Sequence, residues 1–387
     1  MLKLTGYEGP RTVEPQELEA VRELSRSVFF PKLTNYLDAA RTWPMALRPA
    51  IHRDMFAMFH DGRPVSVIGR LERDIVVHGV ALRMGFIGDV CTHPDHRNKG
   101  LAGTILAACF KRFHENGVDI VYISGGRGLY LRAGANPAGG LAQFVLKPSV
   151  LAVRPPAPSL RVATVNDASL LAKLCALEPV RFIRPRSDYE LIIQYGHCCG
   201  RPCEFIVLEG NGTPVGYLHT SRPAEKDGRV SQHVFEYGGD RAAVFSAIAQ
   251  LAGQLPANGD LRVDVHGADG LGRLLGEAGL SGQPVRFGGT LKLLDSARTM
   301  RKLKPYLAEH LPVEAVDSLE FATGGERYVV WCKGGSLRID GESNMLWTLL
   351  GPPPGQQVAN VHAAGALRDL VTRCLPLPLP SIYVNVI

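Results

Sequence analysis

The stretch Gly88-Asp-Val-Cys-Thr-His-Pro-Asp-His-Arg-Asn-Lys-Gly-Leu-Ala-Gly-Thr104 decides the fold of the first part of this chain. Residues typical of a strand open it, a polar turn follows, and apolar residues then recur at the period of a helix. The pattern Arg97-x-x-Gly100-x-Ala102 stands where that helix begins. Unpaired backbone N–H groups and the positive end of a helix dipole bind phosphate at such a place, provided that no bulky side chain covers them. The stretch therefore predicts a strand-to-helix turn that binds a pyrophosphate.

The segments on either side predict an α/β (α+β) module with a mixed sheet. A strand and a helix come first, three strands form a meander, and a helix, a buried strand, a short helix and a last strand follow. In chain order we expect these elements at residues 2–7, 14–29, 55–60, 64–73, 80–92, 101–115, 119–124, 129–133 and 141–146. Prolines clustered at residues 154–158 then end the module, because they continue neither a helix nor a central strand.

Residues 160–294 repeat this order of elements. Glycines of the first copy recur in the second, since Gly125, Gly128 and Gly134 fall on Gly267, Gly270 and Gly276, whereas Tyr130 falls on Gly272. The turn of the second copy, Tyr237-Gly-Gly-Asp-Arg-Ala242, lacks the Arg-x-x-Gly-x-Ala pattern and places Asp240 where a pyrophosphate would approach. Like charges repel, so we expect the second copy to be structural.

The last part of the chain predicts a small α+β domain. Its expected elements are a helix at 297–311, strands at 319–322, 328–333 and 336–339, helices at 343–350 and 363–373, and an extended tail that ends at Ile387. The predicted domains are therefore a catalytic module at 1–150, a degenerate copy at 151–295 and a C-terminal domain at 296–387.

Composition and charge exclude several classes of protein. The chain has 387 residues, 45% of them hydrophobic, and its net charge of +6 is spread along the sequence rather than gathered in basic runs. This pattern gives little support to nucleic-acid binding. No apolar stretch approaches the roughly 18 residues of a membrane span, and the first residues lack a signal-peptide core, so we expect a cytoplasmic protein without membrane partners.

The cysteines are expected to be reduced thiols in that compartment. The run His197-Cys-Cys-Gly-Arg-Pro-Cys203 contains zinc-ligand types, because thiolates and imidazole bind zinc. It lacks a second Cys-x-x-Cys half and has a proline between candidate ligands. We therefore expect no metal.

Two motifs carry a resemblance to a known family. The stretch Val90–Thr104 resembles the acetyl-CoA signature of the GNAT superfamily of N-acetyltransferases, and the run Ile123–Ala138 looks like the strand-loop-tyrosine segment of the enhanced-intracellular-survival (Eis-like) acetyltransferases. The plan of an active GNAT module, a degenerate one and a sterol-carrier-like C-terminal domain is similar to that family as well. The resemblance implies acetyl-CoA as cosubstrate, a primary amine as acceptor with aminoglycoside- or lysine-like amines possible, and a homo-oligomer, with a hexamer as one form.

The resemblance also implies site residues. If the neighbouring strand splays away from the strand Val90-Cys91-Thr92, the free backbone groups of that strand can bind the pantetheine amides of acetyl-CoA. The same splay places the thioester carbonyl near backbone donors that can stabilise an oxyanion. The expected acetyl-CoA ligands are Val90, Cys91, Thr92, Arg97, Asn98, Lys99, Gly100, Leu101, Ala102, Gly103, Thr104 and Ser124. Tyr130 is the implied general acid, since a phenol can protonate a departing thiolate.

The general base stays open between several groups. The resemblance implies the terminal carboxylate of Ile387, whereas Asp89 and His93 flank the predicted cofactor strand and are the side-chain candidates. Two other functions remain open at this point: a sensor that binds CoA or a lipid without turnover, and an acyltransferase with another acyl group or acceptor.

Overall fold

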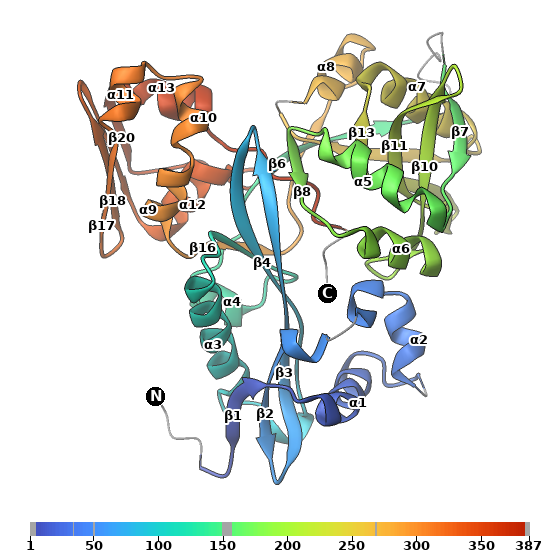
Figure 1. Ribbon diagram of the computed structural model, residues 1–387, viewed down its shortest axis with the longest axis vertical. Helices are drawn as coiled ribbons and strands as arrows, with labels where there is room; N and C mark the ends of the chain where they lie inside the picture. Colours follow the sequence, from blue (N-terminus) through green and yellow to red (C-terminus); the bar gives the residue numbers. More distant parts are fainter. Residues whose placement is uncertain (1–4, 34, 49–50, 149–156, 268, 384–387) are drawn as a thin grey trace.

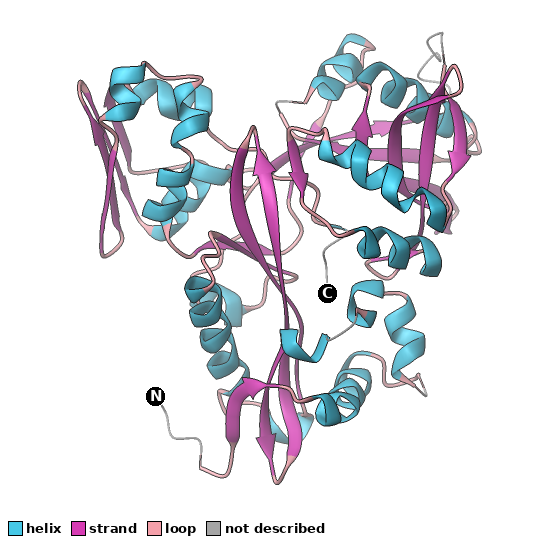
Figure 2. Ribbon diagram, viewed as in Figure 1, coloured by secondary structure: helices cyan, strands magenta, loops and turns pink. Residues whose placement is uncertain are grey.

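The computed structural model describes residues 5–33, 35–48, 51–148, 157–267 and 269–383, and they form three parts (Figure 1). A first module of residues 8–132 lies at the bottom of the view. A second module of residues 159–277 lies at the upper right, and a C-terminal unit of residues 296–374 lies at the upper left, followed by a tail of residues 375–383. Figure 2 shows that every part combines helices with strands, as the α/β prediction requires.

The first sheet has the strand order β1-β2-β3-β4-β5-β16, and β8 pairs with the far end of β3. All neighbours are antiparallel except β4 and β5, which run parallel. The strands are β1 (Glu8–Thr12), β2 (Met55–His60), β3 (Arg63–Val77), β4 (Val80–Thr92), β5 (Ile120–Ile123), β8 (Val180–Phe182) and β16 (Thr290–Leu293). The long hairpin of β3 and β4 runs from the first module up between the other two parts (Figure 1).

Helices cover both faces of this sheet, because its central strands carry apolar side chains on both faces. On β2, Ala57 and Phe59 pack with the face of α1, whereas Phe56 and Met58 pack with the face of α3. The helical segments of this module are η1 (Pro15–Glu17), α1 (Leu18–Phe29), α2 (Tyr36–Arg41), η2 (Pro44–Leu47), η3 (Ile51–Asp54), η4 (Pro94–His96), α3 (Leu101–Glu115) and α4 (Gly128–Arg132). The two apolar clusters fix α1 and α3 on opposite sides of β4.

The second sheet has the order β15-β6-β14-β13-β11-β10-β7, with β12 beside β13 and β9 beside β10. Its strands are β6 (Gly140–Leu146), β7 (Ser159–Val162), β9 (His197–Cys198), β10 (Arg201–Gly210), β11 (Thr213–Ser221), β12 (Ala224–Lys226), β13 (Arg229–Gly239), β14 (Asp260–Val265) and β15 (Gln283–Arg286). Its helical segments are η5 (Val165–Asp167), α5 (Ala168–Ala176), α6 (Arg186–Tyr195), α7 (Arg241–Gly253) and α8 (Gly270–Glu277). As in the first sheet, one central pair, here β13 and β14, is parallel.

The two modules exchange their last strands. Strand β6 leaves the first module and pairs with β14 and β15 of the second sheet, while β16 returns from the second part of the chain and pairs with β5. The crossing is supported by two backbone hydrogen bonds between Asn136 and Leu291, each 2.8 Å long. A cut after residue 150 would therefore leave β5 without its neighbour β16.

The C-terminal unit has a four-stranded antiparallel sheet in the order β17-β18-β19-β20, with helices on one side (Figure 2). Its core is continuous with the first sheet, since Phe86 and Tyr122 share one apolar cluster with Leu337 and Leu349. The elements are α9 (Ser296–Lys302), α10 (Lys304–Ala308), α11 (Val313–Asp317), β17 (Glu320–Gly324), β18 (Arg327–Cys332), β19 (Gly335–Asp340), α12 (Glu342–Leu350), β20 (Val361–Gly365), α13 (Leu367–Asp369) and η6 (Leu370–Cys374).

Several expected elements differ from the structure. The prediction of one helix over 363–373 is wrong, because its first residues form the edge strand β20 on β19 and helical turns begin only at Leu367. Gly365 explains the break: it has a φ of 59°, and a Cβ there would lie 1.8 Å from the carbonyl oxygen of Gly334. The first strand is β1, Glu8–Thr12, rather than residues 2–7, of which the first three lie outside the described residues.

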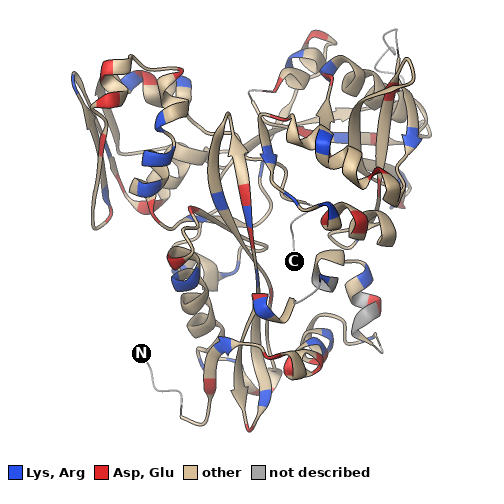
Figure 3. Ribbon diagram, viewed as in Figure 1, with Lys and Arg blue, Asp and Glu red and all other residues tan. Residues whose placement is uncertain are grey.

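Charged residues of both signs are interspersed over all three parts of the ribbon (Figure 3). Among the described residues, no helix combines the length and apolar character that a membrane crossing needs. Across the same residues, no group of three or more His, Cys, Asp or Glu side chains is arranged to hold a metal ion.

Candidate active site

The parallel strands β4 and β5 separate at the middle of the first sheet. They pair from Met84 opposite Ile120 to Ile87 opposite Ile123, and the N–H of Ser124 donates the last hydrogen bond to the carbonyl of Ile87, at 3.1 Å. Beyond Ile87, β4 continues to Thr92 with β3 as its strand partner. Backbone groups on the β5 side of this segment therefore face the gap between the strands, where an extended ligand can pair with them.

A bulge in β4 gives Asp89 an unusual backbone conformation at the start of the unpaired segment. The β3–β4 register shifts between the pairs Val67–Cys91 and Gly69–Gly88, and Asp89 adopts a φ of 48°. Bulges re-aim side chains next to functional sites. Local sequence allows the conformation because Asp tolerates the left-handed region better than most residues.

The turn after β4 leaves the N-terminus of α3 open. Gly100 is the N-cap of this helix with a φ of 80°, no side chain caps the helix, and its first turn contains no acidic residue. A Cβ placed on Gly100 would meet no atom within 4 Å. The first N–H groups of α3 and the positive end of its dipole are thus available to an anion.

The predicted cofactor ligands surround the gap and this helix start. Arg97, Asn98, Lys99 and Gly100 are exposed on the turn, and the guanidinium of Arg97 donates to the carbonyl of Thr92 at 3.3 Å. The remaining predicted ligands on β4 and α3 are buried or half-buried: Val90, Cys91, Thr92, Leu101, Ala102, Gly103 and Thr104.

The side chain of Cys91 is buried under α1, on the side of the sheet where Asp89 also contacts Ser25. It belongs to the apolar cluster under α1, and its Sγ lies 3.9 Å from the hydroxyl of Ser25. Burial raises its pKa well above the ordinary thiol value. Only the backbone of Cys91 is therefore placed to contact a ligand in the gap.

A cavity of about 270 Å³ lies beside the gap and brings together residues far apart in the sequence. Four of its lining residues are predicted site residues: Asp89, Val90, Ser124 and Tyr130. The others are mostly apolar and come from α1 and its C-cap, the segment 40–55, β3 and the loop before α4: Ser25, Phe29, Phe30, Ala40, Trp43, Ile51, Met55, Gly69, Gly125 and Arg127. The prediction did not include Ser25 or Arg127.

The two ionisable groups of this cavity have shifted pKa values. The hydroxyl of Ser25 donates to Oδ2 of Asp89 at 2.7 Å. Burial nevertheless raises the pKa of the Asp89 carboxyl to about 7, with the Ser25 hydrogen bond acting in the opposite direction. Burial also raises the pKa of the Tyr130 phenol, which nearby Arg127 opposes, and Tyr130 is only 4% exposed. One group is thus poised to exchange a proton near neutral pH and the other keeps its proton.

The other candidate bases lie elsewhere or outside the described residues. His93 accepts a hydrogen bond through Nδ1 from the N–H of Asp95 at 3.3 Å and thereby shapes the turn. It is not among the described residues that line the cavity. Ile387 lies outside the described residues, which end at Tyr383.

Residues 10–138 match a protein-family model described as the acetyltransferase (GNAT) domain. This part of the chain carries a GNAT acetyltransferase domain. A comparison with curated proteins gives no match.

Solved structures with the same fold cover between 76% and 96% of this chain. A GCN5-related N-acetyltransferase from Kribbella flavida aligns with a TM-score of 0.67 at 15% identity, over 96% of this chain and 99% of that one. A GCN5-related N-acetyltransferase from Anabaena variabilis gives 0.61 at 14%, over 87% and 85%. Eis1 from Mycobacterium abscessus gives 0.54 at 12%, over 76% and 74%. At these identities the likeness shows the fold.

The second module differs from the GNAT domain at the place of the turn. Strands β13 and β14 pair in parallel from Ser231 to Val234 and then separate, as β4 and β5 do. However, α7 begins directly after β13, and the carboxylate of Asp240 accepts from the N–H of Ala243 at 2.7 Å. The start of α7 is thus capped by a side chain of the protein itself.

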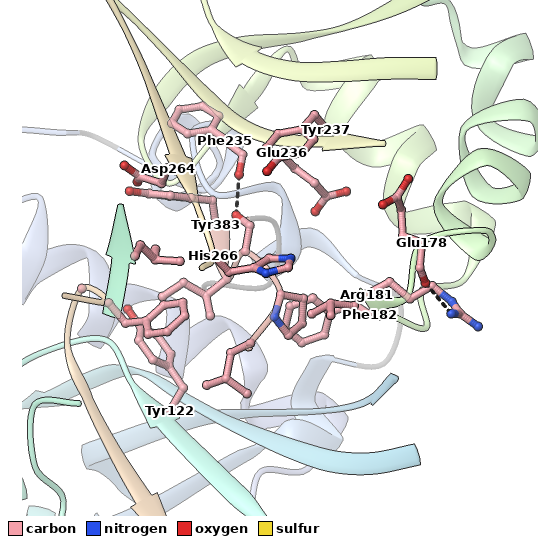
Figure 4. A pocket seen from close by; sticks show the side chains of 18 of the residues that line it. Tyr122, Glu178, Arg181, Phe182, Phe235, Glu236, Tyr237, Asp264, His266 and Tyr383 are labelled. Carbon is pink, nitrogen blue, oxygen red and sulfur yellow. Dashed lines mark hydrogen bonds between the residues drawn. The ribbon is translucent and has the colours of Figure 1, made fainter. Parts of the chain in front are cut away.

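A second cavity, of about 380 Å³, lies between the GNAT domain and the second module (Figure 4). Trp43 and Ser124 line both cavities, so the two adjoin. The tail forms one wall: the hydroxyl of Ser381 donates to the carbonyl of Phe235 at 2.5 Å, and the carbonyl of Tyr383 accepts from the thiol of Cys199 at 2.8 Å.

Proposed function

We propose that this protein is an acetyl-CoA-dependent N-acetyltransferase that acts on a primary amine. One observation carries the proposal: the gap between β4 and β5, the uncapped start of α3 and the cavity with Asp89 and Tyr130 adjoin one another in a GNAT domain. Acetyl transfer from acetyl-CoA is the reaction associated with that domain, and its acceptor is our inference.

The residues fit acetyl-CoA. Its pyrophosphate would lie against the N–H groups that follow Gly100, with Arg97 and Lys99 as nearby cations. The pantetheine arm would pair with the backbone of Val90–Thr92 on the side that β5 leaves. This path leads from the turn to the cavity that contains Asp89 and Tyr130.

Transfer of the acetyl group needs two proton movements on groups of this chain. Asp89, whose pKa lies about 7, accepts the proton that the amine loses as its nitrogen forms a bond to the thioester carbon. Tyr130 donates its proton to the sulfur as the carbon–sulfur bond breaks. Backbone N–H groups beside the bulge at Asp89 are the candidates for stabilising the oxyanion that forms between these events.

The terminal carboxylate of Ile387 remains the competing proposal for the base. The tail supports it indirectly, because residues 379–383 line the cavity that adjoins Asp89. A fusion of extra residues after Ile387 separates the two proposals: it leaves an Asp89-dependent enzyme active and inactivates an enzyme that uses the terminal carboxylate.

The direct test is thiol release from acetyl-CoA in the presence of a panel of primary amines. We expect amine-dependent release of free CoA together with an acetylated amine in mass spectra. Binding of acetyl-CoA without acetylation of any amine would overturn the proposal and support a sensor. Faster reaction with a longer acyl-CoA would change the acyl group and leave the site assignment intact.

The same proposal covers the domain boundaries, the sterol-carrier-like character of the C-terminal unit and a homo-oligomeric, cytoplasmic enzyme. Size-exclusion chromatography with light scattering tests the oligomeric state, for which a hexamer is the proposed form.

A further inference from the structure

The second cavity contains many charged groups, and they differ in whether the protein already pairs them. Four carboxylates line it, from Glu178, Glu236, Asp264 and Asp269. Figure 4 shows Glu178, Glu236 and Asp264 around the space in which His266 lies. A ligand amine can pair with such a carboxylate only where the protein has left it free.

All four carboxylates are bound by donors of the chain. Arg241 forms ion pairs with Glu178 at 2.5 Å and with Asp269 at 2.9 Å. Glu236 accepts hydrogen bonds from both terminal nitrogens of the buried Arg184, at 2.6 and 2.8 Å, and from the hydroxyl of Tyr217, at 2.7 Å.

Asp264 is the fourth. It accepts from Gln143 at 2.8 Å and contacts Nε2 of His233 at 3.1 Å. The four carboxylates of this cavity are therefore already paired with donors of the protein and are less available to a ligand.

Three guanidinium groups of the same cavity are different. Arg181, Arg201 and Arg286 line it, and within the described part of the chain none of them forms an ion pair with a carboxylate. Among the described residues, the guanidinium of Arg181 donates to the backbone carbonyl of Glu178, at 2.6 Å. Arg181 is half-buried, whereas Arg201 and Arg286 are exposed, so all three are accessible to a bound molecule.

These three arginines lie where they can contact the acceptor amine. The cavity adjoins the one with Asp89 and Tyr130 through Trp43 and Ser124, and an amine that reacts there extends its remaining atoms into the larger space. An acceptor with several positive charges would meet unpaired guanidinium groups, which repel it. An acceptor with a carboxylate or a phosphate would pair with them, and Arg is suited to bind either in bidentate form.

We infer that the acceptor is an amine that also carries an anionic group, a carboxylate or a phosphate, and that Arg201 and Arg286 select it. This inference rests on the proposed N-acetyltransferase function, and it adds the substrate class. Amino acids with a side-chain amine and amino-sugar phosphates belong to that class.

The test compares amines that differ only in the anionic group: L-lysine with cadaverine, and glucosamine 6-phosphate with glucosamine. In at least one of the two pairs, we expect kcat/KM to be about tenfold higher for the anionic amine than for the amine without the anionic group. The difference is modest because each solvent-accessible charge pair contributes little binding free energy. The better of the two pairs identifies the carboxylate or the phosphate as the recognised group. The preference should fall as ionic strength rises.

Variants assign the preference to the cavity. Arg201→Gln and Arg286→Gln should each raise KM for the anionic amine about threefold to fivefold, with little change in kcat or in KM for acetyl-CoA. Arg301→Gln is the matched control, because Arg301 is exposed on α9 of the C-terminal unit and its replacement removes the same charge.

The outcomes separate the two levels of the proposal. Equal rates for both members of each pair, or a preference for cadaverine and glucosamine, would overturn the inference and leave the N-acetyltransferase in place. Failure of all four amines and of a wider panel to react with acetyl-CoA would remove the proposed function and the inference with it.

Discussion

Helices α3 and α7 start at equivalent places in two copies of one fold, and their first residues differ in a simple way. Gly100 begins α3 without a cap, while Asp240 caps α7 with its own carboxylate. Each helix needs an acceptor or an anion at its positive end. The first copy can obtain it from a ligand, whereas the second contains it in the chain and also lacks the turn that precedes Gly100.

The strand gaps of the two copies differ in the same sense. The gap beside β4 adjoins the cavity of Asp89 and Tyr130. In the second module, Ser381 of the tail donates to the carbonyl of Phe235, the residue that follows the last β13–β14 pair. A segment of the chain thus occupies the place that a ligand would take in the first copy.

The largest effect is expected at the open helix start. Gly100→Glu should abolish acetyl-CoA binding in calorimetry, because it adds bulk and negative charge where the pyrophosphate approaches. Gly117→Glu is the matched control: Gly117 also has a positive φ, of 74°, with no atom within 4 Å of an added Cβ, and it lies at the other end of α3. Both variants carry the same backbone strain, and equal loss of binding in both would contradict the assignment.

Tyr130→Phe should be next in size. If the phenol protonates the thiolate, kcat should fall about 100-fold or more, the lower end of the range for general acid catalysis. The ring still fills its buried place, so acetyl-CoA affinity and Tm should hardly change. A Phe variant with full kcat would exclude Tyr130 as the acid.

The strand-to-helix turn of the first module could be predicted because it depends on local pattern. The residues of β4 and the start of α3 follow from the change between strand and helix periods, and both agree with the structure. The importance of Ser25 could also have been predicted, because this polar residue shares a helix face with Val21 and Leu24. In the structure Ser25 is only 2% exposed. A hydroxyl on such a face needs a partner, and that partner is Asp89.

The strand exchange and the second cavity could not be predicted from local pattern. Alternation along β6 tells which face is buried but not that its neighbours are β14 and β15. The second cavity depends on a contact between distant segments, where a Cβ on Gly200 would lie 3.4 Å from the ring of Trp43. The local sequence of either segment does not indicate this tertiary contact.

Asp89→Asn tests the base through pH. With a pKa of about 7, Asp89 should make kcat/KM of the wild type fall as pH decreases below about 7, and the Asn variant should lose this limb. At pH 8 the variant should be about 100-fold slower, with a smaller difference at pH 6, where the wild type is itself largely protonated. An unchanged limb in the variant would assign the base to another group.

Stability gives an independent control for that variant. The folded-state pKa of Asp89 lies above its ordinary value, so the folded state keeps a proton that the unfolded chain has lost at intermediate pH. Stability therefore falls as pH rises from about 4 to about 7, and the full cost is present above that window. Asn carries no such charge, so the Tm of the variant should exceed that of the wild type at pH 8 and converge with it near pH 4.

The smallest effect on binding is expected at Asp240, and it is the most direct test of the comparison between the two helix starts. Asp240→Ala removes the carboxylate that accepts from the N–H of Ala243, so the free energy of unfolding should fall by about 1 kcal/mol, the usual contribution of an N-cap. Acetyl-CoA should still bind at one site per chain, because α7 follows β13 directly and lacks the turn that precedes Gly100. A stoichiometry near two in calorimetry would mean that the Asp240 carboxylate alone kept the second module from binding acetyl-CoA. The missing turn would then not explain why the wild-type second module does not bind it.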